Sequence, residues 1–266
     1  MKRATLIAWI GRTETMKQVY EAFADKTIKE FSRFAKSYTL ALEPDSKELS
    51  DAIEMIKSTG EKRIRLFSEV YYTKRELATA EYFRLSTLAP LELEGTSSKK
   101  YGTKHLNQCD KCLMCGELVG DVYVDRKFMK KQKLGTLFPD LFVSEEIRLA
   151  IEEAELTGVK FGGLVKDYKG REMNEKYYVM HITSVLPPLS KSTWLQEGAE
   201  CSQGHTVRYL QSDLMYEREK LVNAQDFNLT CEHLNNFFLQ EIVVSAKVKK
   251  VLSKYRLMFR EPICIL

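Results

Sequence analysis

Three of the six cysteines of this 266-residue chain stand at every third position, in the stretch Cys109-Asp110-Lys111-Cys112-Leu113-Met114-Cys115-Gly116. A Cys-x-x-Cys turn that ends in glycine aims two sulfurs at one point, because glycine accepts the positive φ of a tight turn. Cys112 and Cys115 therefore supply half of a tetrahedral zinc site. The other two ligands must come from elsewhere in the chain.

The best candidate for the second half is Cys201-Ser202-Gln203-Gly204-His205, a Cys-x-x-x-His turn that also holds a glycine. The predicted ligand set is Cys112, Cys115, Cys201 and His205. Four protein ligands complete the coordination of zinc, so this spacing predicts a structural metal rather than a catalytic one. The alternative is a group of reduced cysteines beside an ordinary surface histidine, and the spacing leaves open whether Cys109 replaces one of the four.

The composition is that of a globular protein, with 44% hydrophobic and 29% charged residues and a net charge of +4. This mild charge does not favour nucleic-acid binding, which needs a strongly basic face. Clustered cysteines favour metal ligands or free thiols in a reducing cytoplasm over a secreted disulfide framework. The short apolar run at residues 4–10 predicts a buried strand, and no run is long enough to cross a membrane. We expect a cytoplasmic protein that does not contact membranes.

These ligands must be positioned by the surrounding helices and strands. The pattern of apolar and capping residues predicts an α+β fold in two regions, residues 1–100 and 101–266. In the first region, apolar residues at helical spacing predict a helix after Thr13 and another through Ile28, Phe31 and Phe34. Ser46 is an expected helix N-cap, and Thr73 with Glu76 forms a capping box for a helix that continues through Phe83. Residues 38–42 and 64–72 have the composition of strands.

The second region contains an internal repeat. Leu141-Phe142-Val143-Ser144 leads into a helix with apolar residues at offsets of 3, 6, 7 and 10 from the serine, and Ile242-Val243-Val244-Ser245 leads into a helix with the same offsets. Each copy predicts a strand, a serine N-cap and an amphipathic helix, after which the chain returns through an apolar segment. Since each copy follows one half of the zinc site, we expect a duplicated zinc-knuckle–strand–helix unit, with copies at about 109–165 and 200–266.

The two predicted helices carry opposite charges on their solvent faces. Either the two copies face each other across a pseudo-twofold axis, or each helix offers a differently charged surface to a partner protein. Exposed ion pairs add little stability individually, which favours recognition of a partner protein. The candidate partner-binding residues are Glu145, Glu146, Glu152 and Glu153 on the first helix, and Lys247, Lys249, Lys250 and Lys254 on the second.

Taken together, Cys112-Leu113-Met114-Cys115-Gly116, the block from Leu141 to Phe161 and the terminal Ile242–Ser245 helix resemble the bacterial double-CxxCG family. The resemblance covers roughly Cys109 to the C-terminus. It implies an immunity protein, which neutralises a cognate toxin by direct binding and has no catalytic residues. The chain departs from the family at its second motif, where His205 stands in place of the second cysteine.

Two other classes of function compete with this interpretation. A zinc-ribbon nucleic-acid-binding protein would use the basic run at residues 126–133. A thiol-dependent enzyme would use a cysteine such as Cys231 with His233 as its base. The chain has no H-E-x-x-H, G-x-S-x-G, Walker or Rossmann glycine pattern, so we predict no catalytic residues and no cofactor other than structural zinc.

Overall fold

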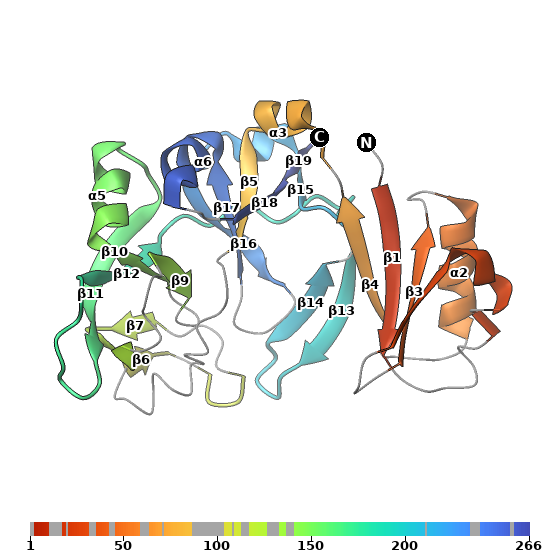
Figure 1. Ribbon diagram of the computed structural model, residues 1–266, viewed down its shortest axis with the longest axis horizontal. Helices are drawn as coiled ribbons and strands as arrows, with labels where there is room; N and C mark the ends of the chain where they lie inside the picture. The colour runs from red at the N-terminus through yellow and green to blue at the C-terminus, as the bar shows by residue number, and fades with distance from the viewer. Residues whose placement is uncertain are drawn as a thin grey trace. The chain divides into compact units, whose positions relative to one another are not determined.

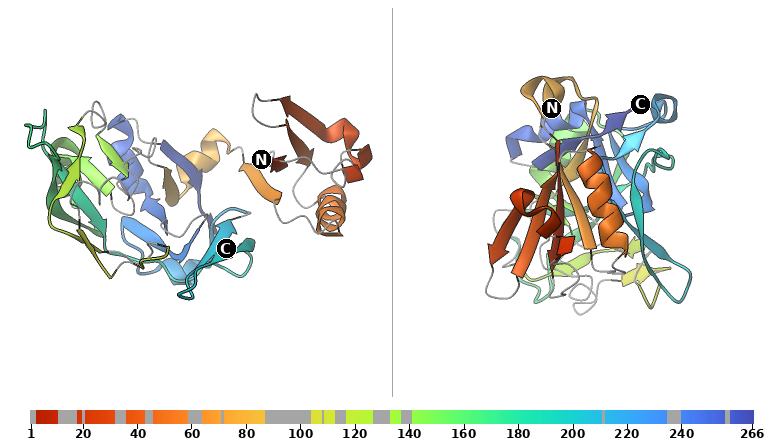
Figure 2. Two further views of the ribbon diagram at one scale, coloured as in Figure 1. Left: turned by 90° about the horizontal axis from the view of Figure 1, so that it is seen from below. Right: turned by 90° about the vertical axis from the view of Figure 1, so that its right-hand side faces the viewer.

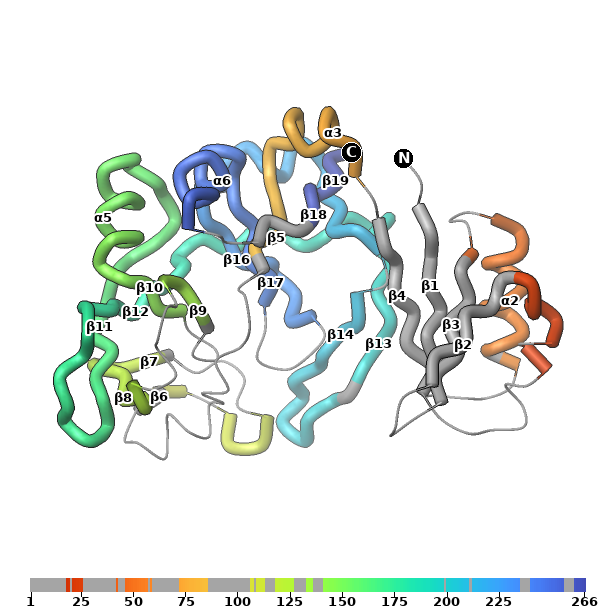
Figure 3. Tube along the Cα trace, viewed as in Figure 1, coloured from red at the N-terminus to blue at the C-terminus, as the bar shows by residue number. Residues whose placement is uncertain are grey.

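The computed structural model describes residues 3–10, 18–19, 21–31, 36–42, 46–58, 64–70, 72–86, 104–107, 109–112, 117–126, 133–136, 141–210, 212–234, 240–255 and 258–266 (Figure 1), and Figure 3 follows the same chain as a tube along its Cα trace. Within these ranges the chain is a mixed α+β protein with several sheets and few helices, as predicted. It divides into two compact units. The first comprises Met1–Ala78 with Gln211–Asp213, and the second comprises Thr79–Leu210 with Leu214–Leu266. None of the helices in the described ranges is long and apolar enough to span a bilayer.

The first unit is built on an antiparallel sheet of order β2-β3-β1-β4. Its strands are β1 (Arg3–Ile10), β2 (Thr27–Phe31), β3 (Lys36–Leu42) and β4 (Ile64–Val70), with the short 3-10 helix η1 (Ala24–Lys26) before β2. Helix α2 (Lys47–Ser58) begins at the predicted cap, where the Ser46 hydroxyl accepts a hydrogen bond from the Leu49 N–H at 3.1 Å. Ala52 and Ile56 form its buried side.

Two predicted helices of the N-terminal region need correction. The helix through Ile28 and Phe31 is wrong, because these residues lie in β2, where Ile28 pairs with Thr39 of β3. The capping box is confirmed: the Thr73 N–H donates to Glu76 at 2.7 Å, and the Glu76 N–H donates to the Thr73 hydroxyl at 3.2 Å. The helix that it opens, α3 (Lys74–Thr79), ends before Phe83, which belongs to strand β5 (Tyr82–Ser86).

The second unit contains a five-stranded sheet of order β8-β11-β12-β10-β9. Strand β10 (Leu141–Ser144) leads directly into helix α5 (Glu145–Glu153), whose N-cap is the predicted Ser144. The chain returns through β11 (Val159–Asp167) and β12 (Tyr177–Ile182), so that β12 lies between the parallel strands β10 and β11. The outer strands are β9 (Leu134–Thr136) and β8 (Val122–Val124).

A four-stranded sheet of order β16-β17-β5-β18 forms the other half of this unit. Strand β17 (Gln240–Ser245) leads into helix α6 (Ala246–Leu252), again with the predicted serine, Ser245, as its N-cap. Its other strands are β16 (Phe227–His233) and β18 (Met258–Pro262), and β5 lies between β17 and β18. Short elements complete it: β15 (Met215–Tyr216), β19 (Cys264–Ile265), η3 (Arg218–Leu221) and η4 (Ser253–Tyr255).

The two sheets resemble each other in the course of their strands, and equivalent backbone hydrogen bonds occur in each. In the first, the Ser144 N–H donates to the Lys133 carbonyl at 2.7 Å, and in the second, the Ser245 N–H donates to the Asp226 carbonyl at 2.9 Å. The N–H of the first residue of each helix donates to the carbonyl of the residue just before the central strand, β12 or β5. These bonds run from Glu145 to Lys176 at 3.0 Å and from Ala246 to Glu81 at 2.8 Å. Each half also contains one parallel strand pair: β8 pairs with β11, and β15 pairs with β19. Helices α5 and α6 contact each other in the assembled unit (Figure 1).

On each sheet the face opposite the helix is covered by a two-stranded hairpin. Alternation along β10 turns Phe142 away from α5, and Phe142 packs in a buried cluster with Leu118 of the hairpin β6 (Lys104–Leu106)–β7 (Glu117–Val119). Val243 of β17 likewise packs with Leu195 and Leu210 of the hairpin β13 (Leu195–Glu200)–β14 (Thr206–Leu210). Figure 2 shows the two hairpins from a second direction. Both hairpins carry part of the candidate site.

Candidate metal centre

Three cysteines and one histidine converge where the two hairpins meet. Cys109 and Cys112 come from the segment between β6 and β7, and Cys201 and His205 come from the turn between β13 and β14. The ligand atoms of these four residues all lie within 4.8 Å of one another. Cys112 and Cys201 are buried, and Cys109 and His205 are half-buried.

Three of the six separations between these atoms are close to those expected around one tetrahedral ion. The Cys109 and Cys201 sulfurs are 3.8 Å apart, and His205 Nδ1 lies 3.3 Å from the Cys112 sulfur and 3.8 Å from the Cys201 sulfur. Around zinc, with bonds of about 2.3 Å to sulfur and about 2.0 Å to nitrogen, tetrahedral angles place two sulfurs about 3.8 Å apart and a sulfur and a nitrogen about 3.5 Å apart. The donor set and its spacing therefore fit zinc, with Nδ1 as the ligand atom of His205.

The Cys201 turn is shaped by its own backbone. The Cys201 N–H donates to the His205 carbonyl at 2.7 Å, and the Gly204 N–H donates to the Cys201 carbonyl at 2.8 Å. Gly204 has a φ of +80°, which side chains other than glycine rarely adopt. The Gln203 N–H points at the Cys201 sulfur at 3.3 Å. This turn therefore holds the sulfur of Cys201 and the imidazole of His205 on the same side.

Backbone amides also surround the Cys109 sulfur. The N–H of Cys112, with that of Lys111, lowers the pKa of the Cys109 thiol to about 6, because N–H donors stabilise a thiolate. A thiolate is the form that binds metal, so the turn prepares Cys109 as a ligand near neutral pH. In both halves of the site, the first cysteine receives the amide of the residue two positions later.

The structure brings together three of the four predicted ligands, Cys112, Cys201 and His205, and adds Cys109. Cys115 lies outside the described residues, so its role stays a prediction. The sequence contains two overlapping Cys-x-x-Cys patterns, and Gly116 favoured the second one. The signal for the first pattern was the spacing of Cys109 itself, whose role the sequence left open.

The predicted partner-binding acids lie on the outer side of α5. Arg148 contacts Glu145 at 3.5 Å and Glu152 at 2.6 Å, and Glu146 lies 3.4 Å from Lys133. Glu153 is exposed. These acids surround Leu149, which is 43% exposed and has a glutamate at each position three and four residues away on either side.

Of the predicted basic residues, Lys247, Lys249 and Lys250 lie on the matching helix, α6, and Lys254 lies directly after it in η4. Lys249 lies over the Phe83 ring, 3.8 Å from its centroid, and burial lowers its pKa. Lys247, Lys250 and Lys254 are exposed, and Lys247 and Lys250, three residues apart, share one side of α6. The Lys247 ammonium donates to the Glu155 carbonyl at 3.4 Å.

The basic run at residues 126–133 is described only at its ends. Arg126 donates to the Glu172 carbonyl at 2.9 Å, and Lys133 pairs with Glu175 at 2.7 Å. Hydrogen bonding to that carboxylate raises the pKa of Lys133. Both ends are thus engaged within the fold, and residues 127–132 lie outside the described part of the chain.

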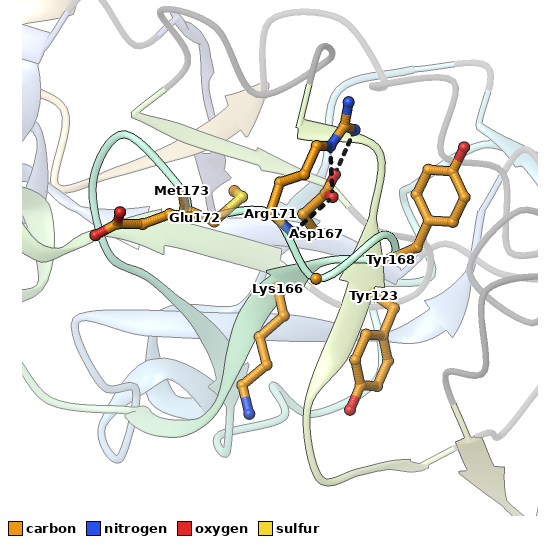
Figure 4. Close-up of a pocket in the computed structure, with 8 residues that line it drawn as sticks. Tyr123, Lys166, Asp167, Tyr168, Arg171, Glu172 and Met173 are labelled. Atoms are coloured by element: carbon orange, nitrogen blue, oxygen red, sulfur yellow. Dashed lines mark hydrogen bonds and ion pairs between the residues drawn. The ribbon is translucent and has the colours of Figure 1, made fainter.

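A depression of about 440 Å³ lies beside the turn between β11 and β12 (Figure 4). Its lining residues include Tyr123, Lys166 and Met173, and a carboxylate–guanidinium pair closes one side, with Arg171 Nη2 at 2.7 Å from Asp167. Lys166 is paired with Asp121. The charged groups here serve the turn and its neighbouring strands, and the four candidate ligands do not line this depression.

No protein-family model matches the chain, and no curated protein sequence matches it.

Proposed function

We propose that Cys109, Cys112, Cys201 and His205 bind one structural zinc ion that fastens the β6–β7 hairpin to the β13–β14 hairpin. The observation that carries this proposal is the approach of four suitable ligand atoms within 4.8 Å. Three soft sulfurs and one imidazole favour zinc over the hard cations, and four protein ligands leave no open position for a substrate.

Metal analysis of the purified chain tests this site. We expect one equivalent of zinc in the wild type and in Cys115→Ser, and loss of zinc in Cys109→Ser and Cys201→Ser. Cys231→Ser is a matched control, because Cys231 is an exposed cysteine on β16. Full zinc content in Cys201→Ser would refute the ligand assignment, and loss of zinc in Cys115→Ser alone would favour the set that the sequence predicted.

The shared strand path and the matching N-cap bonds support a second proposal, that the two halves of this unit are copies of one zinc-knuckle–strand–helix unit. The cation–ring contacts also correspond. Arg148 lies 4.8 Å from the centroid of Tyr178, and Lys249 occupies the equivalent place over Phe83. In this interpretation each copy contributes one hairpin and two ligands, and the metal joins the copies.

The function that we propose for this scaffold is non-catalytic: an immunity protein that binds and neutralises a toxin. Its support is the resemblance to the double-CxxCG family, the closed ligand set and the charged outer faces of α5 and α6. Leu149 within its ring of glutamates has the pattern of an interface anchor, an apolar side chain surrounded by charge that steers a basic partner.

The proposal predicts a toxin gene beside the gene of this chain, and co-expression with that toxin tests it. Wild-type protein should restore growth, and Leu149→Glu and Glu153→Lys should weaken protection. Val222→Glu is a control on another surface, because Val222 is 78% exposed beside η3. Death of cells that contain folded wild-type protein would contradict the immunity function while leaving the zinc site untouched.

A further inference from the structure

Two of the candidate ligands form a thiol pair that crosses between the hairpins. The Cys109 and Cys201 sulfurs are 3.8 Å apart, although 92 residues separate them in the chain. Both are free cysteines. Because Cys109 is half-buried and Cys112 and Cys201 are buried, Cys109 is the sulfur that a small oxidant reaches first.

Cys109 has two sulfur neighbours, because its thiol also hydrogen-bonds with the Cys112 side chain, and the groups around these two neighbours favour Cys201 as its partner. The Cys112 sulfur lies 3.3 Å from His205 Nδ1, so it is engaged with the imidazole. The Cys201 sulfur faces Cys109 and also lies 3.8 Å from the same nitrogen. A sulfur–sulfur bond of about 2.05 Å requires these two side chains to close by less than two ångströms, a movement that surface turns accommodate.

We infer that hydrogen peroxide converts Cys109 and Cys201 into a disulfide that replaces the metal as the link between the two hairpins. The inference deepens the proposed zinc site, since the released ion is the one bound there. A metal that joins two hairpins by four ligands loses two of them in this reaction. Cys112 and His205 alone do not hold it.

The reaction balances in two steps. The Cys109 thiolate attacks one peroxide oxygen, the O–O bond breaks, and the departing hydroxide takes a proton to form water. The Cys201 thiolate then attacks the sulfenic sulfur, the S–S bond forms, and a second hydroxide leaves and is protonated. One peroxide and two protons are consumed, two waters form, and the sulfurs lose two electrons. The zinc ion leaves unchanged in charge.

As a consequence, the two hairpins stay connected when the site is oxidised. With zinc, the link consists of coordinate bonds that require reduced thiols, and with peroxide the link becomes covalent between the same two turns. A thiol reductant restores both cysteines and therefore the metal site. The scaffold that carries α5 and α6 then keeps its hairpins fastened in either state.

Peptide mapping of the zinc-loaded full chain after treatment with hydrogen peroxide tests this inference. Trypsin cuts after Lys111, so Cys109 falls in the peptide 105–111, separate from the peptide that contains Cys112 and Cys115, and Cys201 falls in the peptide 192–208. We expect one equivalent of released zinc, measured with a colorimetric indicator, and a single cross-link between peptides 105–111 and 192–208. A cross-link to the Cys112 peptide, or zinc release with no disulfide, would overturn the inference.

Variants sharpen this result. Cys231→Ser should release zinc at the wild-type rate. In the metal-free protein, Cys201→Ser should abolish the cross-link, and Cys109→Ser should slow oxidation of Cys201, followed in the peptide 192–208, by about tenfold or more, because Cys109 is the most accessible sulfur of the site. If the purified chain holds no zinc, the zinc proposal fails, and formation or absence of the same cross-link in the metal-free chain still decides the disulfide.

Discussion

The turn after β11 depends on one carboxylate. Asp167 is buried and accepts hydrogen bonds from the backbone N–H groups of Arg126, Lys169 and Arg171, and from the Arg171 guanidinium at 2.7 Å. These bonds, those from the Arg171 side chain above all, hold the pKa of Asp167 well below its usual range. A carboxylate with this many donors fixes the turn rather than taking part in chemistry.

We expect Asp167→Asn to lower the free energy of unfolding by about 2–4 kcal/mol near neutral pH, because it leaves buried donors poorly satisfied. Since the pKa of Asp167 is lowered by folding, its contribution is present above the unfolded pKa of about 3.9 and is lost as pH falls below that value. Urea denaturation at neutral and acidic pH checks this: the difference between wild type and variant should shrink in acid. A difference that grew in acid would contradict the assignment.

Gly158 shows how a single position controls the junction between the two sheets. It has a φ of +86°, and a Cβ there would lie 2.1 Å from the Phe227 carbonyl oxygen of β16. We expect Gly158→Ala to destabilise the protein by about 3 kcal/mol or more, and Gly170→Ala, at a φ of +70° in open space, by about 1 kcal/mol. Equal effects in urea denaturation would show that backbone strain alone, and not the contact with β16, sets the cost.

Residue patterns predicted much of the site but not all of it. Cys112, Cys201 and His205 were found from two short turns, since each turn aims its ligands locally. The role of Cys109 depends on amides that point at its sulfur, and sequence spacing does not distinguish Cys109-x-x-Cys112 from Cys112-x-x-Cys115. The ring of glutamates around Leu149 was visible as charge, and the exposure of Leu149 required the packed helix.

At the scale of elements, the two strand–serine–helix segments invite a direct comparison. Ser144 accepts the Ile147 N–H at 3.4 Å, and Ser245 accepts the Val248 N–H at 3.3 Å. Ser245 also donates to the Asp226 carboxylate at 2.6 Å. Ser144→Ala should therefore lower the free energy of unfolding by about 1 kcal/mol, as measured by urea denaturation. Ser245→Ala should lower it by about 1 kcal/mol more than Ser144→Ala does, because the bond to Asp226 is lost as well. A smaller cost for Ser245→Ala would contradict the role of Asp226 in this junction.

Local signals predicted the elements best where caps and periodicity agreed. Ser46, Thr73, Ser144 and Ser245 each mark the start of a helix as expected. The segment Thr27–Phe31 was misassigned because its apolar spacing also suits a helix, and pairing with β3 decided the outcome. The insertion of β5 between β17 and β18 was not predictable, since it pairs residues 82–86 with residues near the C-terminus.

At the scale of the whole second unit, the proposed zinc ion would act on stability through the two hairpins. Each hairpin is a two-stranded sheet, a structure of marginal stability alone, and each covers a core cluster of its own larger sheet. A ligand that binds only the folded state adds stability in proportion to the logarithm of its free concentration relative to its dissociation constant. Zinc should therefore stabilise this unit more than any single side chain does.

Removal of zinc with a strong chelator should lower the melting temperature of the wild type by several degrees, corresponding to about 3–4 kcal/mol, and added zinc should restore it. Cys201→Ser should have the melting temperature of the chelator-treated wild type, and neither the chelator nor added zinc should change it. Cys231→Ser should behave like the wild type. Hydrogen exchange would localise the effect, with faster exchange in β6–β7 and β13–β14 than in the central strands β12 and β17. If chelation removed the metal and left exchange in both hairpins unchanged, zinc would not be the element that fastens them.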